Sequence, residues 1–238
     1  GIDVSIPHWP HRCFSLIFLP AVCRFLDKKT LHLPSKTDKF SCSLLRHLLF
    51  LSFAIYVGLY RQLRKMRLLF LAIYYGFAQH LPNSYSKCGG GQLWNEIRIF
   101  CCRRIFKYCG KVSTINRHAY FGNGRNVEIG DYSGIGENCV IPNNIIGKYV
   151  MMAPEVYIVA NGHVFSSVNK PMCFQGTTGR QNQTIIDDDC WLGVRTILTP
   201  GHHIGKGSII GAGSVVTKDV EPYSIVGGNP ARLIRKRT

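Results

Sequence analysis

The sequence has few acidic residues and no apolar run long enough to suggest a membrane span. Only 13 of its 238 residues are Asp or Glu, against 29 Lys or Arg, so the formal net charge is +16 at pH 7. The apolar runs 48–60 and 68–78 have 13 and 11 residues, whereas a spanning helix needs about 20. Neither run therefore predicts a transmembrane helix, although both are compatible with a position at a membrane surface.

The excess positive charge is unevenly placed. Residues 1–110 carry 16 basic and 4 acidic residues, and residues 111–238 carry 13 and 9. A strongly basic chain often binds nucleic acid or an anionic membrane. Because the excess lies outside the repetitive second half, we expect no nucleic-acid partner.

The ten cysteines contain no C-x-x-C pair. Such pairs mark most structural zinc sites, so we expect no metal. Cys139 and Cys190 fall on the small positions of a repeat described below, where a thiol packs as a compact hydrophobic group. We expect reduced cysteines and a cytoplasmic protein.

No methionine precedes Met66, and residues 1–65 show neither a repeat nor a clean amphipathic pattern. We interpret residues 1–65 as an atypical N-terminal extension, with the hypothesis that Met66 is the initiator and that the extension is non-native. The alternative is a disordered or membrane-associated segment, because the apolar run 48–60 is followed by a basic cluster at 61–67.

Residues 66–110 predict a helical lead-in to the second half. Between residues 93 and 108, apolar and basic side chains interleave with a rough helical period. Such a helix would cover the otherwise open edge of a stack of strands. A basic helix on a membrane surface is the alternative.

The second half of the chain repeats an apolar residue every six positions. The repeat is formed by Ile129, Ile135, Ile141, Ile146, Met152, Ile158, Ile186, Leu192, Leu198, Ile204, Ile210 and Val216, with one step of five after Ile141. A helix repeats every three or four residues and an exposed strand every two. A period of six predicts a β-solenoid, in which three hexads form a coil of about 18 residues and coils stack about 4.8 Å apart.

These hexads define the predicted domains. Residues 111–222 form the solenoid, a loop at 163–184 projects from it, and residues 223–238 form a basic C-terminal tail. The hexads, the loop and the closing IGAGSVVTKDVEPYSIVGGNPARLIR resemble the hexapeptide-repeat acyltransferases, near their maltose, galactoside and capsular-polysaccharide O-acetyltransferases. The resemblance implies a mainly β fold, a left-handed parallel β-helix, assembled as a homotrimer that uses acetyl-CoA.

His163 opens the loop, directly after a hexad. The resemblance places the catalytic histidine there, as the general base that removes a proton from a hydroxyl, and histidine has a suitable pKa. His202 and His203 lie in a turn, and His202, which falls on a small inward position of its hexad, is expected to be packed and hydrogen-bonded. A zinc site like that of the γ-class carbonic anhydrases is the competing interpretation.

The resemblance also marks the donor site. It implies that Trp191 flanks the pantetheine arm, that the backbone at Gly193 and Val194 lies near the thioester, and that Ala212 contacts the arm. The nucleotide end is assigned to Thr217, Lys218, Arg232 and Arg235. An amide N–H near Val194 is expected to support the oxyanion.

The expected function is transfer of an acetyl group from acetyl-CoA to a hydroxyl of a sugar or surface-polysaccharide precursor. The loop, with Ser166, Asn169, Gln175 and Arg180, is expected to shape the acceptor pocket. The alternatives are an acceptor such as an antibiotic, and a non-catalytic trimeric scaffold. The inner face of the membrane, reached through the N-terminal segment, is the alternative to a free cytoplasmic location.

Overall fold

The computed structural model describes residues 62–86, 90–178 and 183–238, together with Ser52 and Gly58. The chain divides into two units, 1–61 and 62–238, and the second contains the six-residue repeat. The interpretations of residues 1–61 therefore lie almost entirely outside the described residues.

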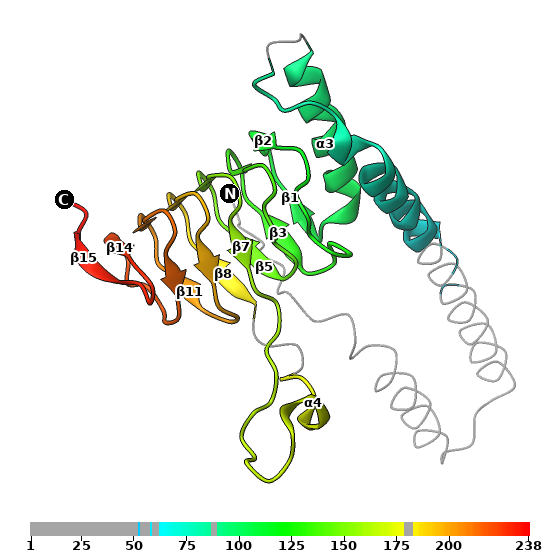
Figure 1. The fold of residues 1–238 in the computed structure, drawn as a ribbon. Helices are drawn as coiled ribbons and strands as arrows, with labels where there is room; N and C mark the ends of the chain where they lie inside the picture. Colours follow the sequence, from blue (N-terminus) through cyan, green and yellow to red (C-terminus); the bar gives the residue numbers. More distant parts are fainter. Residues whose placement is uncertain (1–51, 53–57, 59–61, 87–89, 179–182) are drawn as a thin grey trace, which may run out of the picture. The chain divides into compact units, whose positions relative to one another are not determined.

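The repetitive half winds into a prism with three sheets of short parallel strands (Figure 1). Sheet A contains β1 (Tyr108–Cys109), β3 (Val127–Ile129), β5 (Asn144–Ile146), β8 (Thr184–Ile186) and β11 (His203–Ile204). Sheet B contains β2 (Thr114–Ile115), β4 (Gly134–Ile135), β6 (Met151–Met152), β9 (Trp191–Leu192), β12 (Ile209–Ile210), β14 (Ser224–Gly227) and the antiparallel β15 (Arg232–Lys236). Sheet C contains β7 (Tyr157–Ile158), β10 (Ile197–Leu198) and β13 (Val215–Val216).

The six-residue repeat fills the interior of the prism, as predicted. Every hexad residue from Ile129 to Val216 is buried, and so are the small residues between them, such as Cys190 and Ser208. The repeat also extends upstream of the predicted run, because Ile115 and Phe121 are fully buried. The five-residue step after Ile141 does not disturb the stacking, since β3 and β5 remain in register.

Helix α3 (Gly91–Ile105) covers the N-terminal edge of sheet B, where β2 is the last strand. The side chain of Asn95 accepts a hydrogen bond from the Ile115 N–H and donates one to the Ser113 carbonyl, both at 2.9 Å. The Arg98 guanidinium is fully buried and its Nε donates to the Ile115 carbonyl at 2.5 Å. These contacts satisfy backbone groups that an exposed edge strand would leave unpaired.

A second helical segment, residues 62–76, precedes the short 3-10 helix η2 (Ala78–His80). It buries Phe70 and Tyr74, and the Tyr74 hydroxyl donates to the Ala119 carbonyl at 2.9 Å. The segment is thereby fixed to the first coil of the prism. Among the described residues, none of the helices has both the length and the hydrophobicity to cross a membrane.

The chain leaves the prism after β7 and returns at β8 (Figure 1). The excursion contains the predicted loop and one short helix, α4 (Met172–Gln175). The predicted basic tail, residues 223–238, holds β14 and β15, which pair with each other. The first prism strand, β1, begins at Tyr108, slightly before the predicted start of the solenoid.

Candidate active site

His163 lies at the foot of the projecting loop, five residues after the end of β7. Its side chain is exposed, and its backbone forms an antiparallel bridge with Thr177 on the returning limb of the loop. The next pair along continues the ladder, with the Val164 N–H donating to the Gly176 carbonyl at 3.1 Å. The position of His163 is therefore set by pairing between the two limbs of the loop.

Thr178 strengthens this pairing beside His163. Its Oγ1 accepts a hydrogen bond from the Gly162 N–H and donates one to the Gly162 carbonyl, both at 3.0 Å. The Thr178 N–H also donates to that carbonyl, at 2.9 Å. Thr178 could not be identified from the sequence, because the two partners are 16 residues apart and no sequence pattern marks the pair.

The side chain of Gln175 forms hydrogen bonds within the outer part of the loop. Its Nε2 donates to the carbonyls of Ser167 and Lys170, at 2.8 and 2.6 Å, and its Oε1 accepts from the Ser167 N–H. Gln175 is thus used inside the loop rather than held open toward an acceptor. Arg180, also expected near the acceptor, lies outside the described residues.

The residues expected to hold the donor arm form a strip along sheet B and the corner that leads to sheet C. Trp191 points outward from β9, between Met151 and Ile209 of the neighbouring strands, and is about half exposed. Gly193 follows at the corner, where an added Cβ would lie 2.6 Å from the backbone nitrogen of Ala212. Only glycine permits this approach of adjacent coils, and Gly193 itself is buried between them.

Two amide groups at this corner are without hydrogen-bond acceptors in the described part of the chain. The Gly193 N–H donates to the Ile210 carbonyl and the Gly213 N–H to the Val194 carbonyl, each at 2.8 Å. The N–H groups of Val194 and Ala212 donate no hydrogen bond to any described residue. The N–H of Val194 is therefore available to a negatively charged oxygen.

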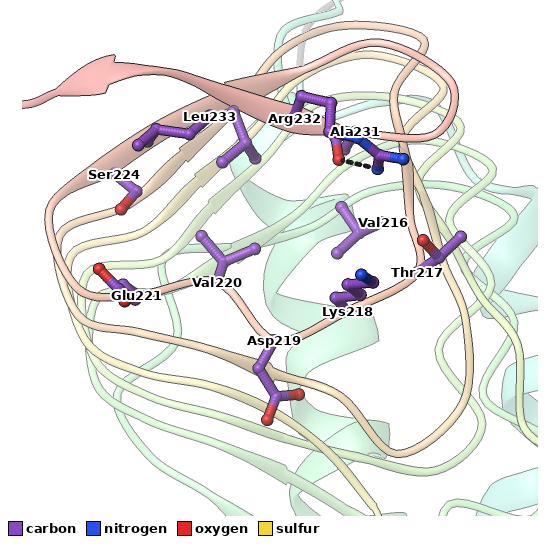
Figure 2. Close-up of a pocket in the computed structure, with 11 residues that line it drawn as sticks. Val216, Thr217, Lys218, Asp219, Val220, Glu221, Ser224, Ala231, Arg232 and Leu233 are labelled. Atoms are coloured by element: carbon purple, nitrogen blue, oxygen red, sulfur yellow. Dashed lines mark hydrogen bonds between the residues drawn. The ribbon is translucent and has the colours of Figure 1, made fainter.

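A pocket of about 350 Å³ lies at the C-terminal end of the prism (Figure 2). Its floor is apolar, with Val216, Val220 and Val226 from the inside of the last coil. The corner after β13 contributes Thr217 and Lys218 to its lining, and β15 contributes Arg232. Figure 2 shows the two cationic side chains on the same side of the pocket as Thr217.

The two carboxylates that line this pocket are engaged elsewhere. Asp219 accepts hydrogen bonds from the His203 N–H at 3.0 Å and from His202, and these lower the pKa of its carboxyl. Glu221 pairs with Lys236 at 2.8 Å, and this ion pair lowers its pKa as well. In the described structure Lys218 and Arg232 form no ion pair, so the pocket favours an anion.

Arg235 does not join this group. It lies on β15 opposite Ile225, its Nη1 donates to the Lys236 carbonyl at 3.2 Å, and it is absent from the pocket lining. Of the four residues assigned to the nucleotide end, the structure therefore brings together three: Thr217, Lys218 and Arg232.

The two halves of the expected site lie on different edges of the prism. His163 and Lys218 follow β7 and β13 at the corner between sheets C and A. Trp191, Val194 and Ala212 lie along sheet B and its corner with sheet C. The width of sheet C separates the two groups within one chain.

His202 and His203 each have a carboxylate partner. His202 Nδ1 lies 3.2 Å from Asp219, and His203 Nε2 lies 2.9 Å from Asp187. These partners are 17 and 16 residues apart in sequence, about one coil, so the coil length could have identified them. The described residues contain no cluster of three or more His, Cys, Asp or Glu side chains that could hold a metal ion.

Comparison with known proteins identifies the class to which this fold and site belong. A family model described as the hexapeptide repeat of succinyl-transferase matches residues 183–218. The galactoside O-acetyltransferase of Escherichia coli K12 is 32% identical over 144 residues, which span 59% of this chain and 69% of that enzyme. The chain belongs to the hexapeptide-repeat acyltransferase family, and its predicted fold class, a left-handed parallel β-helix with a helical N-terminal segment, is confirmed.

Two solved structures and one further relative sharpen the comparison. A maltose O-acetyltransferase from Clostridium difficile is 28% identical, has a TM-score of 0.56, and covers 74% of this chain and 89% of its own. A galactoside acetyltransferase in complex with coenzyme A is 25% identical, with a TM-score of 0.55 and coverages of 74% and 82%. The chloramphenicol acetyltransferase of Agrobacterium fabrum is 57% identical over 54 residues, 23% of this chain. That alignment spans about a quarter (26%) of the relative's own length.

Proposed function

We propose that the protein transfers an acetyl group from acetyl-CoA to a hydroxyl of a sugar or of a surface-polysaccharide precursor. The observation that carries the proposal is the fixed position of His163 at the foot of the loop, in a chain whose relatives include galactoside and maltose O-acetyltransferases. The residues present fit the donor. The strip at Trp191–Val194 suits a pantetheine arm and the pocket at Lys218 and Arg232 suits phosphates.

The mechanism follows from these placements. Acetyl-CoA supplies the acyl group as a thioester. His163 removes the acceptor's hydroxyl proton as the new C–O bond forms and the C–S bond breaks. The Val194 N–H stabilises the developing negative charge on the carbonyl oxygen, and an amide in this role can contribute about 3–4 kcal/mol. His163 then gives the proton to the departing thiolate, so no other acid or base is required.

A His163→Ala variant tests the assignment of the base. We expect the rate of thiol release to fall by about 10²–10⁴, the range for loss of a general base, while the dissociation constant for CoA, measured by calorimetry, stays unchanged. His80→Ala, at an exposed histidine of the 3-10 helix η2, is the matched control. A His163→Ala variant with full activity would refute the assignment.

The acceptor is tested with a panel of galactosides, maltose, nucleotide sugars and chloramphenicol. The galactoside relative aligns over 69% of its length, whereas the chloramphenicol relative aligns over 26%. We therefore expect the highest kcat/KM with a sugar. The antibiotic remains the second candidate because of its 57% local identity, and preferential turnover of chloramphenicol would establish it.

We further propose that the active protein is a homotrimer, with each site formed between two subunits. Two features support this: His163 and Trp191 lie on different edges of one prism, and the outward side chains of sheet C, including Tyr120, Tyr157 and Ile197, are apolar and substantially exposed. Light scattering should give three times the 26.8 kDa chain mass.

Co-expression of His163→Ala chains with Trp191→Ala chains tests the shared site. Each variant alone lacks one half of every site. In randomly mixed trimers about one interface in four pairs an intact His163 with an intact Trp191 from its neighbour. We expect about a quarter of wild-type activity to return. No recovery in mixed trimers would show that each site lies within one chain.

A further inference from the structure

The helical segment 62–76 has an exposed apolar stripe beside its buried one. The buried stripe packs Phe70 against Phe100 of α3 and Tyr74 against Phe121 of the prism. The exposed stripe follows the helical spacing of three or four residues and carries large apolar side chains that are roughly 40–60% exposed, at Met66, Leu69, Ile73 and, just after the helix, Phe77. A helix in water normally pairs its buried stripe with a polar face. The exposed stripe is therefore a surface that lacks the usual polar character, and we name these four residues the outer apolar face.

The charged residues beside the outer apolar face are almost all basic. Arg64 and Lys65 lie at the start of the helix, and Arg104 of α3 stacks on Phe100, its centre 3.6 Å from the ring. None of these cations forms an ion pair with a described residue. In the sequence, Glu96 is the one acidic residue between positions 62 and 110. An exposed apolar face edged by unpaired cations matches an anionic lipid surface.

The charge of the preceding segment argues against that segment as the occupant. Residues 1–61 contain eight Lys or Arg and three Asp or Glu, so their sign is the same as that of the cations beside the face. The helix contacts the prism through Tyr74 and Tyr75, which donate to the carbonyls of Ala119 and Gly122, rather than through the outer apolar face.

We propose that the outer apolar face docks the protein on the surface of an anionic phospholipid bilayer, placing it at the inner face of the membrane. Met66, Leu69, Ile73 and Phe77 enter the region between headgroups and acyl chains, and Arg64, Lys65 and Arg104 contact lipid phosphates. The helix lies in the plane of the surface. This proposal does not depend on the acetyl-transfer reaction.

The test measures co-sedimentation of the full chain with vesicles of equal parts phosphatidylcholine and phosphatidylglycerol, and with phosphatidylcholine alone. We expect binding to the anionic vesicles, weakened by salt and several-fold lower on the neutral ones. Replacing Leu69 and Ile73 together by Glu should reduce the partition coefficient about tenfold or more. Replacing Arg64 and Lys65 by Gln should reduce it roughly fivefold per cation.

The matched control replaces Val168 and Met172 by Glu, two exposed apolar residues on the projecting loop, and should sediment like the unchanged protein. Thermal melting checks that each variant is folded. Equal binding to both vesicle types, or undiminished binding by the Leu69 and Ile73 variant, would overturn the proposal. So would a change of oligomeric state in that variant without lipid, or new protease cleavage within residues 1–61, because these would identify a second copy or the preceding segment as the occupant.

Discussion

The prism and the helical segments that cover its first coil are stabilised in different ways. In the prism, each hexad residue points inward and fills the interior in the same way as the residue six positions away. At the N-terminal edge, single side chains such as Asn95 and Arg98 satisfy particular backbone groups of one strand, β2. A repeated interaction can be recognised in the sequence, whereas a single one has no second instance to reveal it.

The largest expected effect on stability lies in the prism. Ile186 is fully buried, and Ile186→Ala should lower the free energy of unfolding by about 3 kcal/mol, because the closely packed interior cannot collapse around the cavity. Ile185, its neighbour on the outer surface of β8, is the control, and Ile185→Ala should cost less than about 1 kcal/mol. Urea denaturation measures both. Equal losses would show that the interior is not close-packed at this coil.

The next effect concerns the covering helix. Arg98→Met removes the donors to the carbonyls of Ile115, Leu81 and Pro82. The Ile115 carbonyl lies in the buried edge, and leaving it unpaired should cost about 2 kcal/mol. The substitution also removes a buried charge whose Nη2 has no partner among the described residues. This gain offsets only part of the cost of the unpaired carbonyl.

Arg103→Met, an exposed change on the same helix, should alter the free energy of unfolding by less than about 0.5 kcal/mol. A stabilised Arg98→Met variant would show instead that desolvation of the guanidinium outweighs its three hydrogen bonds.

The projecting loop, like the covering helix, depends on single contacts. Thr178→Val removes the hydrogen bond that Oγ1 accepts from the Gly162 N–H and the one that it donates to the Gly162 carbonyl, next to His163. We expect kcat to fall about tenfold while the KM for acetyl-CoA stays the same, because misplacing a catalytic group by a fraction of an ångström slows the chemical step. Thr178→Ser should restore the rate, and Thr177→Val serves as the control. A rise in KM alone would assign Thr178 to substrate binding.

The smallest effect is expected from pH at the last corner of the prism. The N–H of His203, and then His202, lower the pKa of Asp219. The ionised carboxylate therefore stabilises the fold above the ordinary pKa near 4, and this contribution is lost as the pH falls below it. Because Asp219 is exposed, the effect should stay below about 1 kcal/mol.

Thermal melting of the unchanged protein and of Asp219→Asn between pH 7 and pH 3 checks this. The difference in Tm should be present at neutral pH and vanish in acid. A difference that grows in acid would contradict the sign of the pKa shift.

The sequence predicted the parts of the candidate site that belong to the repeat. Trp191 lies on the outer side of a strand because Leu192 is a hexad residue, and side chains alternate along a strand. Thr217 and Lys218 lie at a corner because they follow the hexad residue Val216. The contact between Thr178 and Gly162 could not be predicted, because it depends on how a non-repetitive loop returns to the prism.

The sequence alone determined the β-solenoid, the position of the loop, and the inward placement of the small residues, because a fixed period of six allows one regular way of burying its apolar side chains. The tertiary structure decided which polar groups meet. It paired Asp219 and Glu221 with His202, His203 and Lys236, leaving Lys218 and Arg232 without an ion pair in the pocket. It also placed His163 and Trp191 on different edges of the prism. Coulomb interactions and hydrogen bonds act between groups that are close in space, and their partners become known only when the coils have stacked.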